Sequence, residues 1–228
     1  MPIALIVGAG SGLSASLARA FHARGLTPVL AARDVSKLSD LAGETDAVTV
    51  AADASTEDGV SAIFKAVDAT GDKLAVAIYN PSYRVRGPIA EVDPAEVHKA
   101  LQVTAYGAFL VGQQAARRML ASGGGTILFT GASAGVKGYP LSAAFAMGKF
   151  ALRGLAQSMA RELHPKGIHV AHVVIDGMIR NPGRTEPADK PDSMLDPNAI
   201  AETYVQLAEQ DRSIWTWEIE TRPWVENF

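Results

Sequence analysis

The chain has 228 residues, enough for one well-buried domain, and 21 lysine and arginine residues against 24 aspartate and glutamate residues give a net charge of −3. This balance leaves no basic block that could neutralise a run of phosphates, which argues against a nucleic-acid partner. Hydrophobic residues make up 48% of the chain, but no apolar stretch approaches the roughly 20 residues of a membrane-spanning helix.

The chain contains no cysteine, which excludes disulfides, thiolate metal sites and cysteine nucleophiles. The N-terminal residues after Met1 lead directly into an apolar run and show no signal-peptide pattern. We therefore expect a soluble, cytoplasmic protein with no bound metal and no membrane partner.

Short apolar runs alternate with longer segments of helical periodicity along the chain. The predicted strands cover residues 3–7, 27–32, 47–51, 74–79, 126–130, 168–175 and 214–219. Helical patterns in the second half lie near residues 94–121, 142–163 and 197–210. Because the strands are continuously apolar, both faces of their sheet must be covered. We predict an α/β, doubly wound Rossmann fold with a mostly parallel sheet of about seven strands, helices on both faces, and a single domain over residues 1–228.

Residues 180–197 interrupt this alternation. They carry four of the 12 prolines together with many charged residues. Their position after the carboxyl end of a predicted strand indicates a surface loop that contacts the substrate.

A glycine-rich loop follows the first predicted strand and leads directly into a helix. Its residues are Gly8, Ala9, Gly10, Ser11, Gly12, Leu13 and Ser14. Glycines let the backbone turn sharply and approach a diphosphate, whose charge then lies against the free N–H groups of the helix start. The spacing G-x-x-x-G-x-S differs from the dinucleotide fingerprint G-x-G-x-x-G, and no Lys-Ser or Lys-Thr pair for a nucleoside triphosphate follows it. We predict that Gly8, Gly10, Ser11, Gly12 and Leu13 bind the diphosphate of a nicotinamide cofactor.

The second strand ends at Arg33 and Asp34, at the level where the adenosine ribose is expected. A guanidinium pairs with a 2′-phosphate, whereas an acid accepts hydrogen bonds from ribose hydroxyls. Arg33 therefore favours NADP, while Asp34 leaves NAD open as the alternative.

The spacing from the glycine loop to Asp53, Asn80 and Lys149 resembles the short-chain dehydrogenase/reductase family over essentially the whole chain. The resemblance implies that Asp53, with Ala54 beside it, contacts the adenine and that Asn80 faces the cofactor. It also implies that Gly177 and Ile179 lie in the segment that bonds the nicotinamide amide.

The catalytic part of the family pattern differs here. The family's Tyr-x-x-x-Lys pair reads Phe145 to Lys149, and phenylalanine cannot transfer a proton. The family's substrate-binding serine falls at Ala132, beside Ser133, and the helix asparagine falls at Thr104. The resemblance implies catalytic roles for Lys149 and Ser133, with Lys149 also binding the nicotinamide ribose.

These residues predict an NADPH-preferring oxidoreductase that transfers hydride to or from a carbonyl, an alcohol or an activated double bond of a small-molecule substrate. The alternative is an NADP-binding sensor or partner subunit with impaired catalysis, which Phe145 and Thr104 would explain. Small residues along segments 105–116 and 143–154 and three tryptophans in the last 14 residues predict a homodimer or homotetramer.

Overall fold

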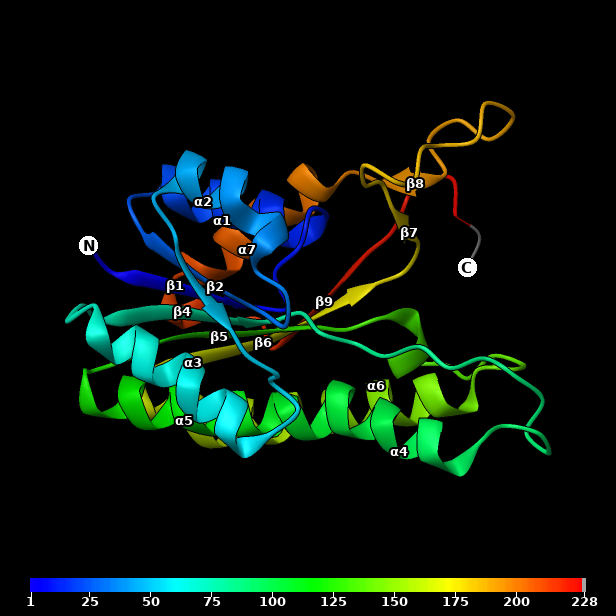
Figure 1. The fold of residues 1–228 in the computed structure, drawn as a ribbon, viewed down its shortest axis with the longest axis horizontal. Helices are drawn as coiled ribbons and strands as arrows, with labels where there is room; N and C mark the ends of the chain where they lie inside the picture. Colours follow the sequence, from blue (N-terminus) through cyan, green and yellow to red (C-terminus); the bar gives the residue numbers. More distant parts are fainter. Residues whose placement is uncertain (227–228) are drawn as a thin grey trace.

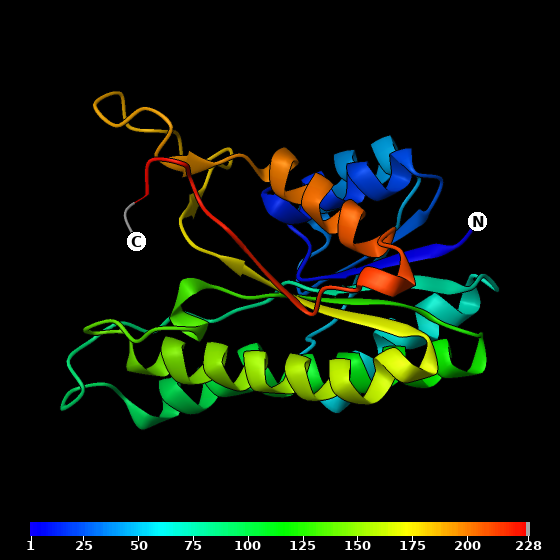
Figure 2. The same ribbon diagram turned by 180° about the vertical axis from the view of Figure 1, so that it is seen from behind.

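A computed structural model describes residues 1–226, in which one β-sheet lies between two layers of helices (Figure 1 and Figure 2). Residues 227 and 228, which the expected domain includes, lie outside the described residues. The strands are β1 (Ile3–Val7), β2 (Thr27–Ala32), β3 (Val48–Ala51), β4 (Leu74–Tyr79), β5 (Gly125–Thr130), β6 (Ile168–Ile175), β7 (Met178–Ile179), β8 (Met194–Leu195) and β9 (Glu218–Thr221). The α-helices are α1 (Leu13–Ala23), α2 (Ser39–Thr45), α3 (Glu57–Ala69), α4 (Pro94–Leu101), α5 (Gly107–Ala121), α6 (Ala143–Leu163) and α7 (Pro197–Ala208).

The main sheet has seven parallel strands in the order β3-β2-β1-β4-β5-β6-β9. The order reverses between β1 and β4, which is the position where ligands bind in open α/β sheets. The predicted doubly wound fold with about seven strands is confirmed.

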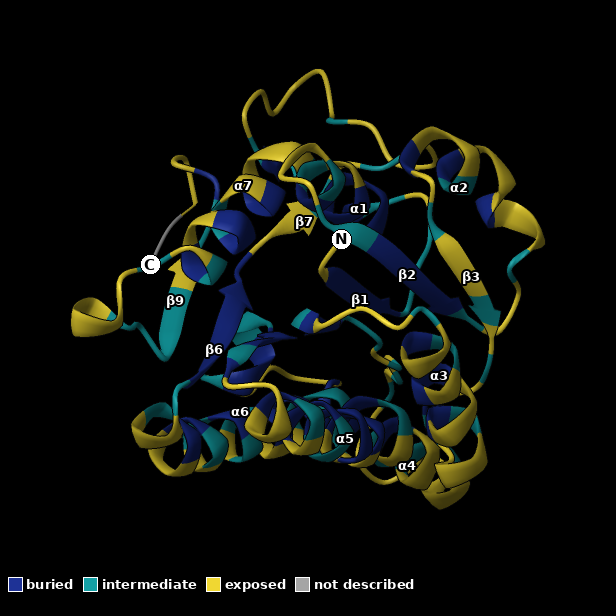
Figure 3. Ribbon diagram, turned by 90° about the vertical axis from the view of Figure 1, so that its left-hand side faces the viewer, coloured by how far each residue is buried: buried dark blue, intermediate teal, exposed yellow. Residues whose placement is uncertain are grey.

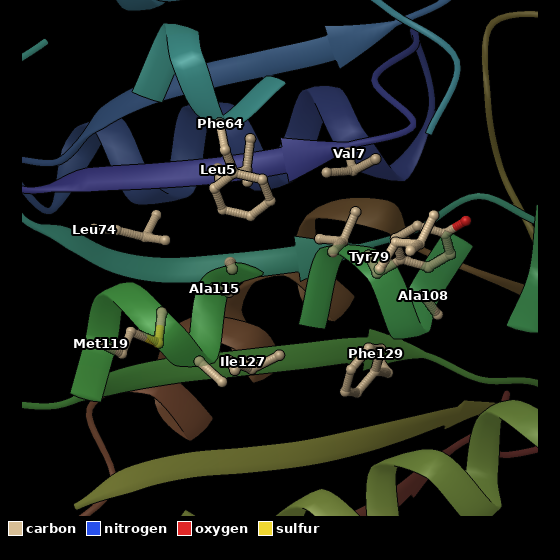
Figure 4. Close-up of a cluster of buried hydrophobic side chains, with 14 of the residues drawn as sticks. Leu5, Val7, Phe64, Leu74, Tyr79, Ala108, Ala115, Met119, Ile127 and Phe129 are labelled. Atoms are coloured by element: carbon tan, nitrogen blue, oxygen red, sulfur yellow. The ribbon is translucent and has the colours of Figure 1, made fainter. Parts of the chain in front are cut away.

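Alternation along β1 assigns the two faces of the sheet. Leu5 and Val7 belong to one hydrophobic core, together with residues of α3, α5 and α6, whereas Ala4 and Ile6 belong to a second core with residues of α1 and α7. Figure 4 shows the first core, where Leu5 and Tyr79 lie among side chains from the sheet and the helices. In Figure 3 the strands at the centre are buried and the outward turns of the helices are exposed. No helix among residues 1–226 is long and apolar enough to cross a membrane.

Three elements differ from the sequence predictions. The helical stretch at 94–121 is divided into α4 and α5 by a π-helical turn, Gln102–Tyr106. The expected strand at 214–219 is replaced by β9, which begins four residues later. Trp215 cannot join the sheet there because its ring stacks on His169, with centroids 4.9 Å apart, and its indole N–H donates to the Gln210 carbonyl.

The segment 180–197 is not a continuous loop. Its residues Met194–Leu195 form β8, which pairs in parallel with β7, and the Arg180 N–H donates to the Leu195 carbonyl oxygen at 2.9 Å. The pairing of β7 with β8 holds the two ends of the intervening segment close together. Residues 181–193 therefore project from the carboxyl end of the sheet (Figure 1).

Candidate active site

Two adjoining cavities lie at the carboxyl ends of the parallel strands. The first, about 480 Å³, is lined by the residues that follow β1, β2, β3 and β4. The second, about 690 Å³, is lined by the residues that follow β5 and β6 and by α6. Asn80 and Ser82 line both cavities, so the two spaces meet at the end of β4.

The glycine loop is fixed to the end of β4 by a buried serine. Gly8 has a φ of +82°, and a Cβ there would lie 2.8 Å from the Pro81 side chain, so only glycine fits. The Ser14 hydroxyl donates to the Gly8 carbonyl oxygen at 2.9 Å and accepts a hydrogen bond from the Asn80 amide at 2.7 Å. Ser14 therefore binds the loop to Asn80.

The rest of the loop leaves backbone accessible at the start of α1. A Cβ at Gly10 would meet nothing within 4 Å, and Ser11 is exposed. Gly12 is the N-cap of α1 and offers no side-chain cap, and no acidic residue lies in the first turn of the helix. Leu13 is buried and lines the second cavity. An uncapped helix start beside bare glycine backbone has the donors and the partial positive charge that a diphosphate requires.

Arg33 and Asp34 both line the first cavity, and their charged groups differ in the contacts they make. The Asp34 carboxylate accepts hydrogen bonds from the Ser36 hydroxyl at 2.6 Å and the Ser36 N–H at 3.0 Å, which lowers the pKa of Asp34. Within the described residues, Arg33 makes no hydrogen bond or ion pair through its guanidinium. The cation at the end of β2 is therefore the group free to bind an anion.

Asp53 and Ala54 form the floor of the first cavity after β3. The Asp53 carboxylate accepts hydrogen bonds from the N–H and the hydroxyl of Ser55, at 2.9 and 2.7 Å, and these bonds lower the pKa of Asp53. The charge of Arg33 lowers it further. Asp53 is therefore ionised and held in a fixed orientation.

Lys149 is the most buried cation of the site. It is 2% exposed, and its ammonium donates to the Thr130 carbonyl oxygen at 2.7 Å. Burial lowers the pKa of Lys149 to about 7. Among the described residues no carboxylate forms an ion pair with it. An ammonium with unused donors facing a cavity fits a pair of ribose hydroxyls.

Phe145 lies one helical turn before Lys149 and lines the same cavity. The Lys149 ammonium is 5.9 Å from the centre of its ring. Phe145 thus presents an apolar ring, with no proton to transfer, beside the buried cation.

The hydroxyl groups near the second cavity differ in their surroundings. Ser133 and Ser142 both line the cavity, Ser133 half-buried and Ser142 buried. Tyr139 also lines it and is 41% exposed. Thr104 is buried in the π-helical turn, where its hydroxyl accepts a hydrogen bond from the Tyr83 N–H at 3.2 Å. Thr104 therefore positions the segment after β4.

Gly177 and Ile179 line the second cavity after β6. A Cβ at Gly177 would lie 2.9 Å from Pro223, so glycine permits the close approach of the chain after β9. Among the described residues no group of three or more His, Asp or Glu side chains could hold a metal ion.

The sequence analysis assigned no role to several cations of the two cavities, although Arg184 lies in the predicted substrate loop at 180–197. They are Lys37 in the first cavity and Arg84, Arg86 and Arg184 in the second. All four lie outside the regular strands and α-helices, in segments that follow strand carboxyl ends, and that position is the signal from which they could have been found.

Comparison with known proteins identifies relatives over the whole chain. A family model described as short chain dehydrogenase matches residues 2–191. The crystal structure of a short-chain dehydrogenase from Rhodopseudomonas palustris is 39% identical, with a TM-score of 0.83 and coverage of 98% of both chains. A metagenomic short-chain oxidoreductase solved in complex with NADP is 28% identical, with a TM-score of 0.85 and coverage of 99% of this chain and 98% of that one. An uncharacterized oxidoreductase from Staphylococcus aureus (strain N315) is 26% identical over 97% of this chain and 96% of its own length.

Proposed function

Because the chain belongs to the short-chain dehydrogenase family, it is an oxidoreductase of that type, and we propose that it prefers NADPH to NADH and acts on a carbonyl, an alcohol or an activated double bond. The observation that carries the proposal is the pair of adjoining cavities, one containing Arg33 and the other Lys149. The NADP complex of the 28% identical relative supports the cofactor class.

The residues present fit a dinucleotide along the two cavities. We assign the diphosphate to the loop at Gly8 to Leu13, where Gly10 and the uncapped start of α1 leave backbone donors free. Arg33 would bind the 2′-phosphate, and Asp53 and Ala54 would contact the adenine.

The second cavity would hold the nicotinamide half and the substrate. Asn80, Gly177 and Ile179 would position the nicotinamide, and Lys149 would donate hydrogen bonds to its ribose. The bound cofactor supplies or accepts a hydride.

Proton transfer must come from a group other than residue 145, because Phe145 has no acidic hydrogen. We propose Ser133, Tyr139 or a water held by Lys149, all at the second cavity. We propose that residue 145 corresponds to the catalytic tyrosine of the family. Phe145 then forms an apolar wall of the substrate site.

We further propose that residues 1–228 form one domain, with a substrate loop at 180–197. We also propose that the protein is cytoplasmic, because a chain with no cysteine suits a reducing compartment. The exposed apolar side chains Phe109 and Leu120 on α5 and Met147 and Phe150 on α6 support a homodimer or homotetramer formed through these helices.

The test is binding of NADPH and NADH to the wild type and to Arg33→Ala, measured by titration calorimetry. Arg33→Ala should weaken NADPH binding about tenfold or more and leave NADH binding nearly unchanged, since only NADPH carries the 2′-phosphate. Arg19→Ala is the matched control, because Arg19 is an exposed arginine bound to Glu44 outside both cavities. Equal weakening of both cofactors, or of neither, would remove the case for NADP. Tight NADPH binding with no turnover on any carbonyl would favour the sensor or partner subunit.

A further inference from the structure

Three arginines that the proposed function does not use line the second cavity. Arg84 and Arg86 lie in the segment between β4 and α4, and Arg184 lies between β7 and β8. Figure 1 shows these two segments leaving the same end of the sheet, one on the side of α4 and α6 and the other on the side of α1 and α7. The three arginines therefore line one space from segments on both sides of the sheet.

Six of the other ten arginines form an ion pair with an acidic side chain, whereas these three form none among residues 1–226. Arg19, Arg118 and Arg153 each bind a carboxylate through two nitrogens, at distances from 2.6 to 2.8 Å. Within residues 1–226 no ion pair involves Arg84, Arg86 or Arg184.

The acidic groups of the second cavity do not cancel this charge. Its charged lining consists of Arg84, Arg86, Lys149, Arg184, Asp176 and Glu226. Asp176 is already within 3.8 Å of the Lys137 ammonium and 3.7 Å of the Arg222 guanidinium. The cavity thus has an excess of positive charge, which attracts and concentrates anions.

Arg84 is held close to the buried end of the cavity. Its guanidinium carbon lies 5.1 Å from the centre of the Phe145 ring, a cation–π contact that orients the group. The same segment is fixed to the turn before α6 by a hydrogen bond from the Gly87 N–H to the Leu141 carbonyl oxygen, at 3.1 Å. Phe145, which lies one helical turn before Lys149 and cannot donate a proton, thus orients the guanidinium of Arg84.

We propose that the substrate carries an anionic group, a carboxylate or a phosphate ester, which Arg84 and Arg86 bind from one side of the second cavity and Arg184 from the other. The proposal rests on the proposed function, in that it assigns the substrate class of the same site. Guanidinium forks bind both kinds of anion through paired hydrogen bonds, so the shared chemistry is a planar or tetrahedral oxyanion.

The experiment measures binding of two probes, inorganic phosphate and succinate, to the full chain by titration calorimetry in the millimolar range. The double variant Arg84→Gln/Arg86→Gln should weaken binding of one or both probes about tenfold or more, because charge-assisted hydrogen bonds are lost. Weakening confined to phosphate or to succinate identifies the preferred anion. Phe145→Leu, which keeps the cavity apolar but removes the ring, should weaken binding less than the double variant.

Two controls separate this site from others. Arg161→Gln removes an exposed arginine of α6 that lines neither cavity and should leave binding unchanged. Arg33→Ala removes the anion site at the end of β2, and an anion bound at the glycine loop survives both this change and the double variant. Only the binding that the double variant weakens therefore belongs to the second cavity. The proposal is overturned if wild type binds neither probe, or if the double variant binds both as wild type does. NADPH binding by wild type and by the double variant is measured separately. If neither protein binds NADPH, the proposed function is overturned, whereas the proposed anion site is not.

Discussion

A single added oxygen atom at residue 145 should raise the rate of carbonyl reduction. Phe145→Tyr adds a hydroxyl to a ring whose centre lies 5.9 Å from the Lys149 ammonium, and a nearby cation lowers the pKa of a phenol. We expect the variant to reduce an activated carbonyl about ten to a hundred times faster than wild type, the lower part of the range for a positioned acid. The measurement is NADPH oxidation over a panel of neutral and anionic carbonyls.

Phe150→Tyr is the matched control, since Phe150 lies on the same helix, is 45% exposed and lines neither cavity. It should leave the rate unchanged. If Phe145→Tyr instead unfolds more easily, by about 1 to 3 kcal/mol, with no gain in rate, its hydroxyl is buried without a partner and the sensor function is favoured.

Lys149 should make the stability of the protein without cofactor depend on pH. Its pKa is about 7 in the folded protein and near 10.5 in an unfolded chain, so the unfolded state binds the extra proton between these values. Its contribution to the free energy of unfolding therefore rises from pH 7 to about pH 10, by a few kcal/mol in order of magnitude. The measurement is urea unfolding of wild type and Lys149→Met across this range, and the difference between them should shrink or reverse as the pH rises. A difference that stays constant with pH would contradict the buried, unpaired ammonium.

The sequence indicates the residues proposed for the cofactor more directly than those proposed for the substrate. Gly8 and Lys149 stand out because a backbone turn and a buried cation impose local patterns that a single chain displays. Arg84, Arg86 and Arg184 follow no such pattern, since they occupy irregular segments about a hundred positions apart that only the sheet brings together.

At the scale of elements, the start of α5 depends on a glycine. A Cβ at Gly107 would clash with the Tyr79 hydroxyl and lie 2.5 Å from the Ala54 carbonyl oxygen. Gly107→Ala should therefore destabilise the protein by about 1 to 3 kcal/mol, and also weaken NADPH binding because Ala54 lines the first cavity. Unfolding in urea and calorimetry measure the two effects.

The control is Gly43→Ala in α2, where a Cβ meets nothing within 4 Å. That change should stabilise the protein by up to about 1 kcal/mol, because alanine is the better helix former. Effects of opposite sign at the two helical glycines would show that close packing, rather than helix propensity, determines the effect of Gly107→Ala on stability. Similar effects at both positions would refute this explanation.

The elements that could be predicted are those whose own residues carry the packing signal. β1, β2, β4 and β6 begin and end where their apolar runs do, because each is covered on both faces. The predicted strand at 214–219 begins four residues before β9. β9 is an edge strand with Glu218 and Glu220 among its four residues, so it shows no continuous apolar run. Glu218 is tolerated there because Arg153 and His172 bind it, at 2.6 and 3.0 Å, and such tertiary partners leave no periodicity in the sequence.

The whole molecule should associate through α5 and α6. Phe109 and Phe150 are 43% and 45% exposed on these helices, and burying such side chains stabilises an interface. We expect a dimer or tetramer by light scattering at micromolar concentration, and Phe109→Glu/Phe150→Glu should shift it toward the monomer. Ile214→Glu, an equally apolar side chain that is 65% exposed between α7 and β9, should leave the mass unchanged. A wild-type monomer would refute the proposed assembly. Trp224, one of the three tryptophans from which association was predicted, is 82% exposed.

The position of β9 bears on how the chain is made. All eight residues of β6 are buried, and β9 covers its outer edge, yet the ribosome completes β6 well before it reaches β9. During that interval the nascent chain presents an apolar strand with unpaired N–H and C=O groups, which is the template on which other chains can add. Chaperones that shield exposed strands would therefore act on this protein during synthesis at β6.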